Sequence, residues 1–123
     1  MNHLIGLEYA WGHRPSDGSG KTDCFQLSCE VRQLLGMGSF ASAYQWVYDQ
    51  YTEDSLPNRR LVRFLFESGK RITTPSAGAM ALFLGERAAL GTVTDYGIMF
   101  IAPGGRVVHA PSFNAAYYFE MNQ

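Results

Sequence analysis

Hydrophobic side chains recur at helical spacing through the first half of the chain. Thr22 or Asp23 can cap the first such stretch and Gly36 ends it, so the pattern predicts a helix between these positions. A second helix is predicted from Ser39, and a third from Pro57, a residue suited to a first helical turn. The inward positions are Leu27, Val31, Leu34 and Leu35 in the first helix, Phe40, Tyr44, Val47, Tyr48 and Tyr51 in the second, and Leu61, Phe64 and Leu65 in the third.

After Pro75 the pattern changes to short apolar or alternating segments separated by Gly and Pro, which is typical of strands. These segments are Ala79–Leu84, Asp95–Ile101, Arg106–Ala110 and Ala115–Met121. Pro103-Gly104-Gly105 predicts a turn because Pro fixes φ and Gly supplies positive φ, so a hairpin is expected across Asp95–Ala110. Helices followed by an antiparallel sheet predict the α+β class.

Length and composition indicate one folded unit. The chain has 123 residues and is 46% hydrophobic, which suits a single domain spanning residues 1–123. Ten Lys and Arg residues balance eleven Asp and Glu residues, so the charge gives no overall attraction to nucleic acid. The longest apolar run, Ala79–Leu84, is far shorter than the about 20 residues of a membrane helix. Met1–Ala10 lacks the basic start of a secretory signal, so we expect synthesis in a cytoplasm without a signal peptide.

Five basic residues gather in one short segment: Arg59, Arg60, Arg63, Lys70 and Arg71. Such a cluster is usually the solvated face of a helix and less often a docking site for an acidic partner. Both interpretations stay open from the sequence.

The two cysteines, Cys24 and Cys29, lie five positions apart in the first predicted helix. That spacing separates their Cα atoms by roughly 8 to 9 Å, beyond the usual reach of a disulfide, so both are expected to be free thiols. His3, His13 and His109 combine with them in no zinc-ligand spacing. No metal and no cofactor are therefore expected.

The segment Pro15–Thr22 resembles a phosphate-binding P-loop, with Pro15 in place of the first glycine. A P-loop must follow a buried parallel strand, and Tyr9–Arg14 is not such a run. We favour a Gly- and Ser-rich solvent loop, with nucleotide binding at Gly18–Thr22 as the remote alternative.

Cys24 is a candidate nucleophile because it stands in the first turn of its predicted helix. Unpaired backbone N–H groups and the helix dipole favour a thiolate there and lower the pKa of a thiol. Cys29 lies more than a turn further along and is expected to be a small packed residue.

Five short blocks of sequence follow one another in a suggestive order. Tyr9–Gly12 precedes Asp23–Leu27 at the start of a helix, and Gly78–Phe83, Asp95–Ile98 and Val107–Pro111 lie in the strand-rich half. These blocks resemble, in the same order, the Y-x-W-G-G, D-C-S-G-F, G-D-L-V-x-F, H-V-G-I and x-I-H-A-P motifs of the NlpC/P60 family of papain-like cysteine hydrolases. The resemblance is greatest to phage-tail-associated members, and it implies a papain-like fold with the cysteine helix packed on an antiparallel sheet.

The resemblance implies Cys24 as nucleophile, but the position of the family's base histidine holds Asp95, and the third, polar position holds His109. A carboxylate beside a thiol raises its pKa, so an unchanged family geometry implies reduced or absent activity. If the two residues act in exchanged order, His109 is the base and Asp95 orients it. Alternatively, His109 is an ordinary half-buried strand histidine. Tyr9 and Trp11 are expected at the pocket rim, as substrate-binding candidates.

Two functions therefore stay open. The first is a cysteine endopeptidase or amidase that acts on peptidoglycan stem peptides, using Cys24, His109 and Asp95 without a cofactor. The second is a catalytically degenerate papain-fold module, a structural or binding part of a phage tail. Ala79 in place of the family's Asp, and Phe25 after the cysteine, indicate degeneration. As a phage component the protein would bind other tail proteins and be incorporated in a virion.

Overall fold

The computed structural model describes residues 2–38, 41–52, 55, 57–84, 89–111, 115 and 117–121, with only the backbone described at 41–44 and 58. The three α-helices are α1 (Cys24–Leu34), α2 (Ala41–Gln50) and α3 (Asn58–Ser68). The strands are β1 (Glu8–Tyr9), β2 (Lys21–Thr22), β3 (Gly69–Ile72), β4 (Met80–Phe83), β5 (Ala89–Thr94), β6 (Gly97–Ile101), β7 (Val107–Ala110) and β8 (Tyr117–Met121). Two short 3₁₀ turns, η1 (Asn2–Leu4) and η2 (Pro15–Asp17), complete the described elements.

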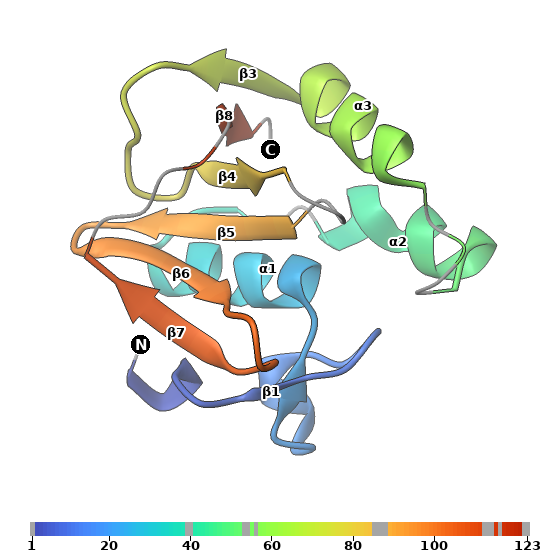
Figure 1. Cartoon of the computed structure of the whole chain (residues 1–123), viewed down its shortest axis with the longest axis vertical. Helices are drawn as coiled ribbons and strands as arrows, with labels where there is room; N and C mark the ends of the chain where they lie inside the picture. The colour runs from blue at the N-terminus through green and yellow to red at the C-terminus, as the bar shows by residue number, and fades with distance from the viewer. Residues whose placement is uncertain are drawn as a thin grey trace.

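Six of these strands form one antiparallel sheet in the order β3-β8-β4-β5-β6-β7. The remaining two, β1 and β2, pair in parallel as a small separate sheet. Helix α1 lies behind β5 and β6 in Figure 1, and α3 runs into β3 at one edge of the large sheet. The α+β class predicted from the sequence is confirmed.

Helix α1 forms where its local sequence predicts it. The Asp23 side chain caps its start by accepting the Gln26 N–H at 2.9 Å, and Gly36 follows its end with φ of 77°. Leu27 and Val31 are buried in the core as expected. The prediction that Leu34 points inward is wrong, since Leu34 is 48% exposed. Leu35, which was also expected inward, packs against the buried cluster at this end of the helix.

The other two predicted helices are also present. Pro57 is the N-cap of α3 rather than its first residue, and Leu61 and Leu65 are buried while Arg59 and Arg63 are exposed. In α2, Val47 is buried. The expected starting positions Ser39 and Phe40 lie outside the described residues, as does the side chain of Tyr44.

The predicted hairpin is formed by β6 and β7, with Met99 opposite His109 and the turn closed by Gly105 N–H donating to Ala102 O at 2.9 Å. The strand expected over Asp95–Ile101 begins two residues later. Asp95 instead lies, with Tyr96, in a two-residue turn that joins β5 to β6, where Thr94 pairs with Gly97.

Strands β3 and β5 were not predicted. Gly91 sits inside β5 because a Cβ atom there would approach the Ile98 side chain to 2.8 Å, and glycine within a strand weakens the sequence signal. Of the expected strand Ala115–Met121, Ala116 lies outside the described residues and β8 begins at Tyr117.

The main core lies between the helices and one face of the sheet, and a second cluster of buried residues, including Ala81, Val93 and Ile98, lies on the opposite face. The main cluster joins Phe25 and Cys29 of α1 and Leu65 of α3 to buried residues of the central strands, among them Leu82 and Leu90. Among the described residues, no helix has the length and apolar character needed to cross a membrane.

Candidate functional site

The start of α1 is built around the buried carboxylate of Asp23. Its Oδ1 accepts the Gln26 N–H at 2.9 Å, and its Oδ2 accepts both the Gly12 N–H at 2.8 Å and the Tyr48 hydroxyl at 2.7 Å. Burial raises the pKa of Asp23 above its ordinary value, although these hydrogen bonds act in the opposite direction. One side chain thus ties the loop before α1, the helix start and α2 together.

Cys24 follows Asp23 and packs, partly buried, against the main core cluster. Burial, with a smaller contribution from the charge of Asp23, raises the pKa of the Cys24 thiol to about 12. Backbone N–H groups, first that of Leu90 on β5, act to lower this pKa but are outweighed. The expectation of a thiol activated by the helix start is therefore wrong, because desolvation exceeds the effect of the helix terminus.

The pKa of Cys24 determines the fraction of this side chain that is present as the nucleophilic thiolate. Relative to the ordinary value of 9.0, a pKa of about 12 lowers the thiolate population of Cys24 at neutral pH by about a thousandfold. An adjacent imidazolium would reverse such a shift. In the part of the chain that the structure describes, no histidine forms a hydrogen bond with Cys24: His13 Nδ1 lies 3.0 Å from Asp17 Oδ2, and His109 Nε2 lies 2.7 Å from Thr94 Oγ1.

His109 and Asp95 lie together at a different place. Both line a surface cavity of about 450 Å³, with Thr94, Tyr96 and Leu35 among the other lining residues. Thr94 organises this corner, since its hydroxyl contacts the imidazole and accepts the Tyr96 N–H at 3.2 Å. The structure therefore brings two of the three predicted catalytic residues to one cavity.

Cys24 is remote from that cavity. Its sulfur lies beside Leu90 at the beginning of β5, whereas the His109 ring contacts Thr94 at the end of the same strand. Four strand residues correspond to about 13 Å. Leu35, which lines the cavity, follows the last residue of α1 while Cys24 is the first, a separation of about 16 Å along a helix. The strand position next to the thiol is thus held by Leu90, a buried apolar residue.

The two predicted substrate-binding residues, Tyr9 and Trp11, lie at different places in the structure. Trp11 packs on the same cluster as Cys24, and its ring centroid lies 5.2 Å from that of Tyr48. Tyr9 instead lines a second cavity of about 390 Å³, together with Gly105 and Arg106 at the β6–β7 turn. Trp11 is therefore a packing residue at the start of α1, and Tyr9 belongs to another surface.

The Gly18–Thr22 segment does not have P-loop geometry. A P-loop places its Lys and Thr at the start of a helix, but here Lys21 and Thr22 form β2, and α1 begins two residues after Thr22. The Thr22 hydroxyl is buried and donates to Asp23 O at 2.9 Å. Asp17 Oδ1 accepts the Ser19 N–H at 2.9 Å, so this backbone donor of the loop is bound by a side chain of the loop itself.

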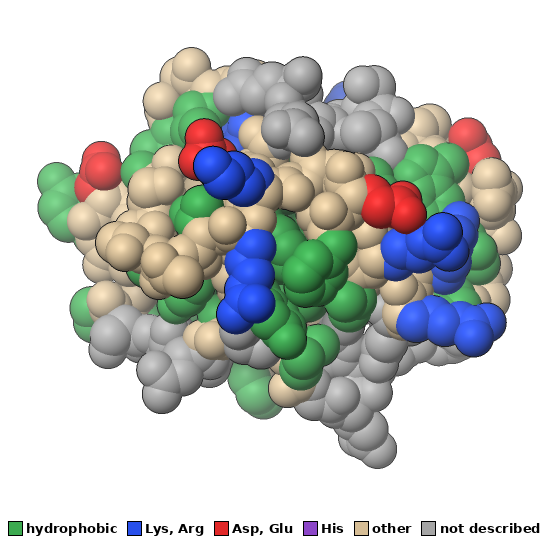
Figure 2. Space-filling view, turned by 90° about the horizontal axis from the view of Figure 1, so that it is seen from above, with side chains coloured by type: hydrophobic (Ala, Val, Ile, Leu, Met, Phe, Trp, Pro, Cys, Tyr) green, Lys and Arg blue, Asp and Glu red, His purple; other side chains and the backbone are tan. Residues whose placement is uncertain are grey.

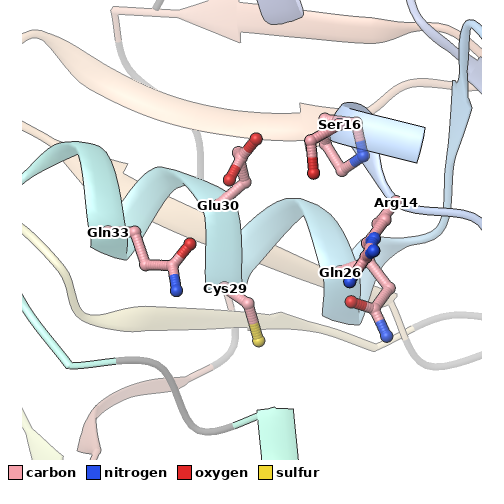
Figure 3. A pocket seen from close by; sticks show the side chains of 7 residues that line it. Arg14, Ser16, Gln26, Cys29, Glu30 and Gln33 are labelled. Atoms are coloured by element: carbon pink, nitrogen blue, oxygen red, sulfur yellow. The ribbon is translucent and has the colours of Figure 1, made fainter. Parts of the chain in front are cut away.

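Cys29 is a packed residue, as expected, and both cysteines are free. It borders a small pocket of about 100 Å³, but in Figure 3 its side chain points away from Glu30 and Ser16. In the same view Arg14 and Gln26 lie at one end of this pocket and Gln33 lies at the other. Within the described residues, no group of three or more His, Cys, Asp or Glu side chains could hold a metal ion.

Two residues of the site have no local signal in the sequence. Tyr48 bonds Asp23 from 25 positions away, and Leu90 reaches the Cys24 thiol from a strand that was not predicted. Tyr48 does stand on the apolar stripe of α2, but that pattern says nothing about which carboxylate its hydroxyl meets.

No family model, curated protein or solved structure matches this chain.

Proposed function

We propose that this chain is a non-catalytic module of the NlpC/P60 type, with a papain-like fold, that serves as a structural or binding part of a larger assembly such as a phage tail. One observation carries the proposal. The Cys24 thiol is buried beside Leu90 with a pKa of about 12, while His109 and Asp95 lie at the opposite end of α1. A cysteine hydrolase needs a thiolate and a proton-transferring base within hydrogen-bond reach of each other.

The order of the sequence blocks supports the family part of the proposal. The chain carries a Tyr-Ala-Trp-Gly loop, an Asp-Cys pair that opens a helix, and a Val-Val-His-Ala strand paired to its neighbour in a hairpin. In the chain's own structure each of these blocks has a packing role: Asp23 ties loop and helix, and Trp11 packs on Tyr48. These blocks are consistent with a protein that has kept the family's fold but has lost its catalytic activity.

The competing proposal is an active peptidoglycan endopeptidase or amidase. For that activity, the Cys24 sulfur would have to leave its apolar surroundings and meet an imidazole, and the nearest strand position holds Leu90 instead. The rearrangement would have to move either α1 or β7 by about 13 Å, the length of four strand residues.

The two proposals differ in one assay. Purified protein is incubated with peptidoglycan fragments beside Cys24→Ala, with Cys29→Ala as the matched control, and the products are analysed by mass spectrometry. We expect identical product traces from all three proteins. Cleavage by the wild type and Cys29→Ala that disappears in Cys24→Ala would contradict the proposal and establish the hydrolase.

A further inference from the structure

The basic residues of this chain are distributed very unevenly. Five of the ten lie between positions 59 and 71, and that segment holds a single acidic residue, Glu67. The rest of the chain therefore carries five basic against ten acidic residues. The segment forms α3 and β3, the helix and edge strand at one end of the sheet.

Part of this segment and Tyr117 of β8 form a contiguous outer surface, which we name the basic-aromatic face: Arg59, Arg63, Phe66, Arg71 and Tyr117. The first three lie on one stripe of α3, at spacings of four and three residues. The ring of Phe66 lies 5.5 Å from that of Tyr117, and the Arg71 guanidinium lies 4.6 Å from the Tyr117 ring. Figure 2, which looks down on this side of the molecule, shows basic side chains on both sides of a hydrophobic patch.

The apolar centre of the face is exposed and held in place. Phe66 is 48% exposed although its ring also packs against Phe119, with 5.0 Å between centroids. An exposed aromatic ring that is already fixed by its neighbours loses little conformational freedom when a partner covers it. Aromatic residues surrounded by arginine are typical of the energetic centre of protein interfaces.

The basic groups are available to a partner. Arg63 Nε is 2.8 Å from Glu67 Oε1, but both side chains are largely exposed, and an exposed pair of this kind is worth about 0 to 1 kcal/mol. A carboxylate from a partner can therefore replace Glu67 at small cost. Arg59 is exposed and has no hydrogen bond or ion pair within the described part of the chain.

We infer that the basic-aromatic face docks an acidic segment of a partner protein, with an apolar side chain of that segment covering Phe66. The charge on the face favours carboxylates, and its exposed ring requires an apolar anchor. A nucleic acid fits less well, because it extends past the face, and the excess acidic charge of the rest of the chain repels a long polyphosphate. The inference rests on the proposed function, since it names the surface through which such a module would join an assembly.

The test uses a short fluorescein-labelled peptide rich in Asp and Glu around a central Leu-Trp pair, titrated with the full chain at low salt and followed by anisotropy. The variants are Phe66→Ser, Arg59→Glu and Arg71→Ala. Lys70→Ala is the matched control, because Lys70 neighbours Arg71 on β3 but points to the opposite face of the sheet, across from Glu120. Far-UV circular dichroism establishes that each variant is folded.

We expect each of the three variants to weaken peptide binding by about tenfold or more and Lys70→Ala to change it less than about twofold. Added salt should weaken wild-type binding. The inference is overturned if the wild-type chain does not bind the peptide, if Lys70→Ala weakens binding as much as Arg71→Ala, or if a labelled oligo-dT binds the same residues more tightly. Cleavage of peptidoglycan would instead contradict the proposed function, whatever the peptide does.

Discussion

The carboxylate of Asp23 should be the most sensitive single point of the fold. It accepts three hydrogen bonds, from Gln26, Gly12 and Tyr48, and is 1% exposed. Asp23→Ala removes a helix cap, worth about 1 kcal/mol, and leaves two other donors without their acceptor at about 1 to 3 kcal/mol each. We expect a loss of about 3 to 7 kcal/mol, a large part of the stability of a chain this size.

Asp23→Asn distinguishes the contribution of the helix cap from that of the other two hydrogen bonds of Asp23. The amide oxygen can still accept the Gln26 N–H, and the Tyr48 hydroxyl can turn to accept from the new NH₂ group, so chiefly the Gly12 N–H loses its acceptor. The expected loss is about 1 to 3 kcal/mol. Tyr48→Phe removes a donor rather than an acceptor and should cost about 1 kcal/mol.

The difference in stability between the wild type and Asp23→Asn should depend on pH. Because the pKa of Asp23 is raised in the folded protein, the folded state holds this proton more tightly than the unfolded chain does. The contribution of this proton to stability is therefore complete below the ordinary pKa of 3.8 and is lost as the pH rises through the folded-state pKa. The stability of the wild type relative to Asp23→Asn should thus be greater at acidic pH.

These quantities are measured by urea unfolding at several pH values, with the fluorescence of the two tryptophans as the probe; one of them, Trp11, packs on Tyr48. Two results would refute the reasoning about Asp23. One is a loss below about 1 kcal/mol in Asp23→Ala, which would mean that the three donors find other partners. The other is a wild-type advantage over Asp23→Asn that grows as the pH rises.

Three further sets of substitutions test the packing. Arg32→Met should lose about 2 to 5 kcal/mol in urea unfolding, because the buried guanidinium donates to two loop carbonyls, at 2.7 and 3.1 Å, that would lose their donors. Gly97→Ala should prevent the β6–β7 pairing, since a Cβ there would lie 1.9 Å from a β7 carbonyl oxygen. The matched control is Gly104→Ala, where φ is also positive but the space is open, and it should cost only about 1 to 2 kcal/mol. Amide hydrogen exchange of β7 should be much faster in Gly97→Ala than in Gly104→Ala. Ser28→Ala should destabilise by about 1 to 3 kcal/mol because it breaks the 2.6 Å hydrogen bond to the buried Thr92 hydroxyl and leaves that hydroxyl unpaired. Adding Thr92→Val should recover part of that loss, whereas equal stability of the single and double variants would show that the unpaired Thr92 hydroxyl costs nothing.

The elements that the sequence predicted are those with local signals. Helix α1 has a cap, an apolar stripe and a terminating glycine within one short segment, and the β6–β7 turn has Pro and two glycines. Strand β5 has no such signal: its sequence is interrupted by Gly91, which is required by the close approach of Ile98 and Phe83. Strand β3 is four residues long and follows α3 without a loop.

The unpredicted strand β5 also explains why the candidate site was only partly foreseen. Because β5 pairs between β4 and β6, the beginning of β5 faces the start of α1, and Asp95 is carried to the far end as a turn residue. The sequence places Cys24 at a helix start correctly. It contains no information on how deeply the sulfur is buried, and that burial determines the sign of the pKa change.

The most direct test is the ionisation of the Cys24 thiol itself. In a Cys29→Ser variant, which leaves a single cysteine, the ¹³Cβ chemical shift of Cys24 is followed from acidic to alkaline pH while the rate of alkylation is recorded. We predict that the shift stays at the thiol value through neutral pH and that alkylation of the folded protein is slower than that of the urea-unfolded chain. A thiolate shift near neutral pH, with alkylation faster in the folded protein, would contradict a buried, inactive cysteine.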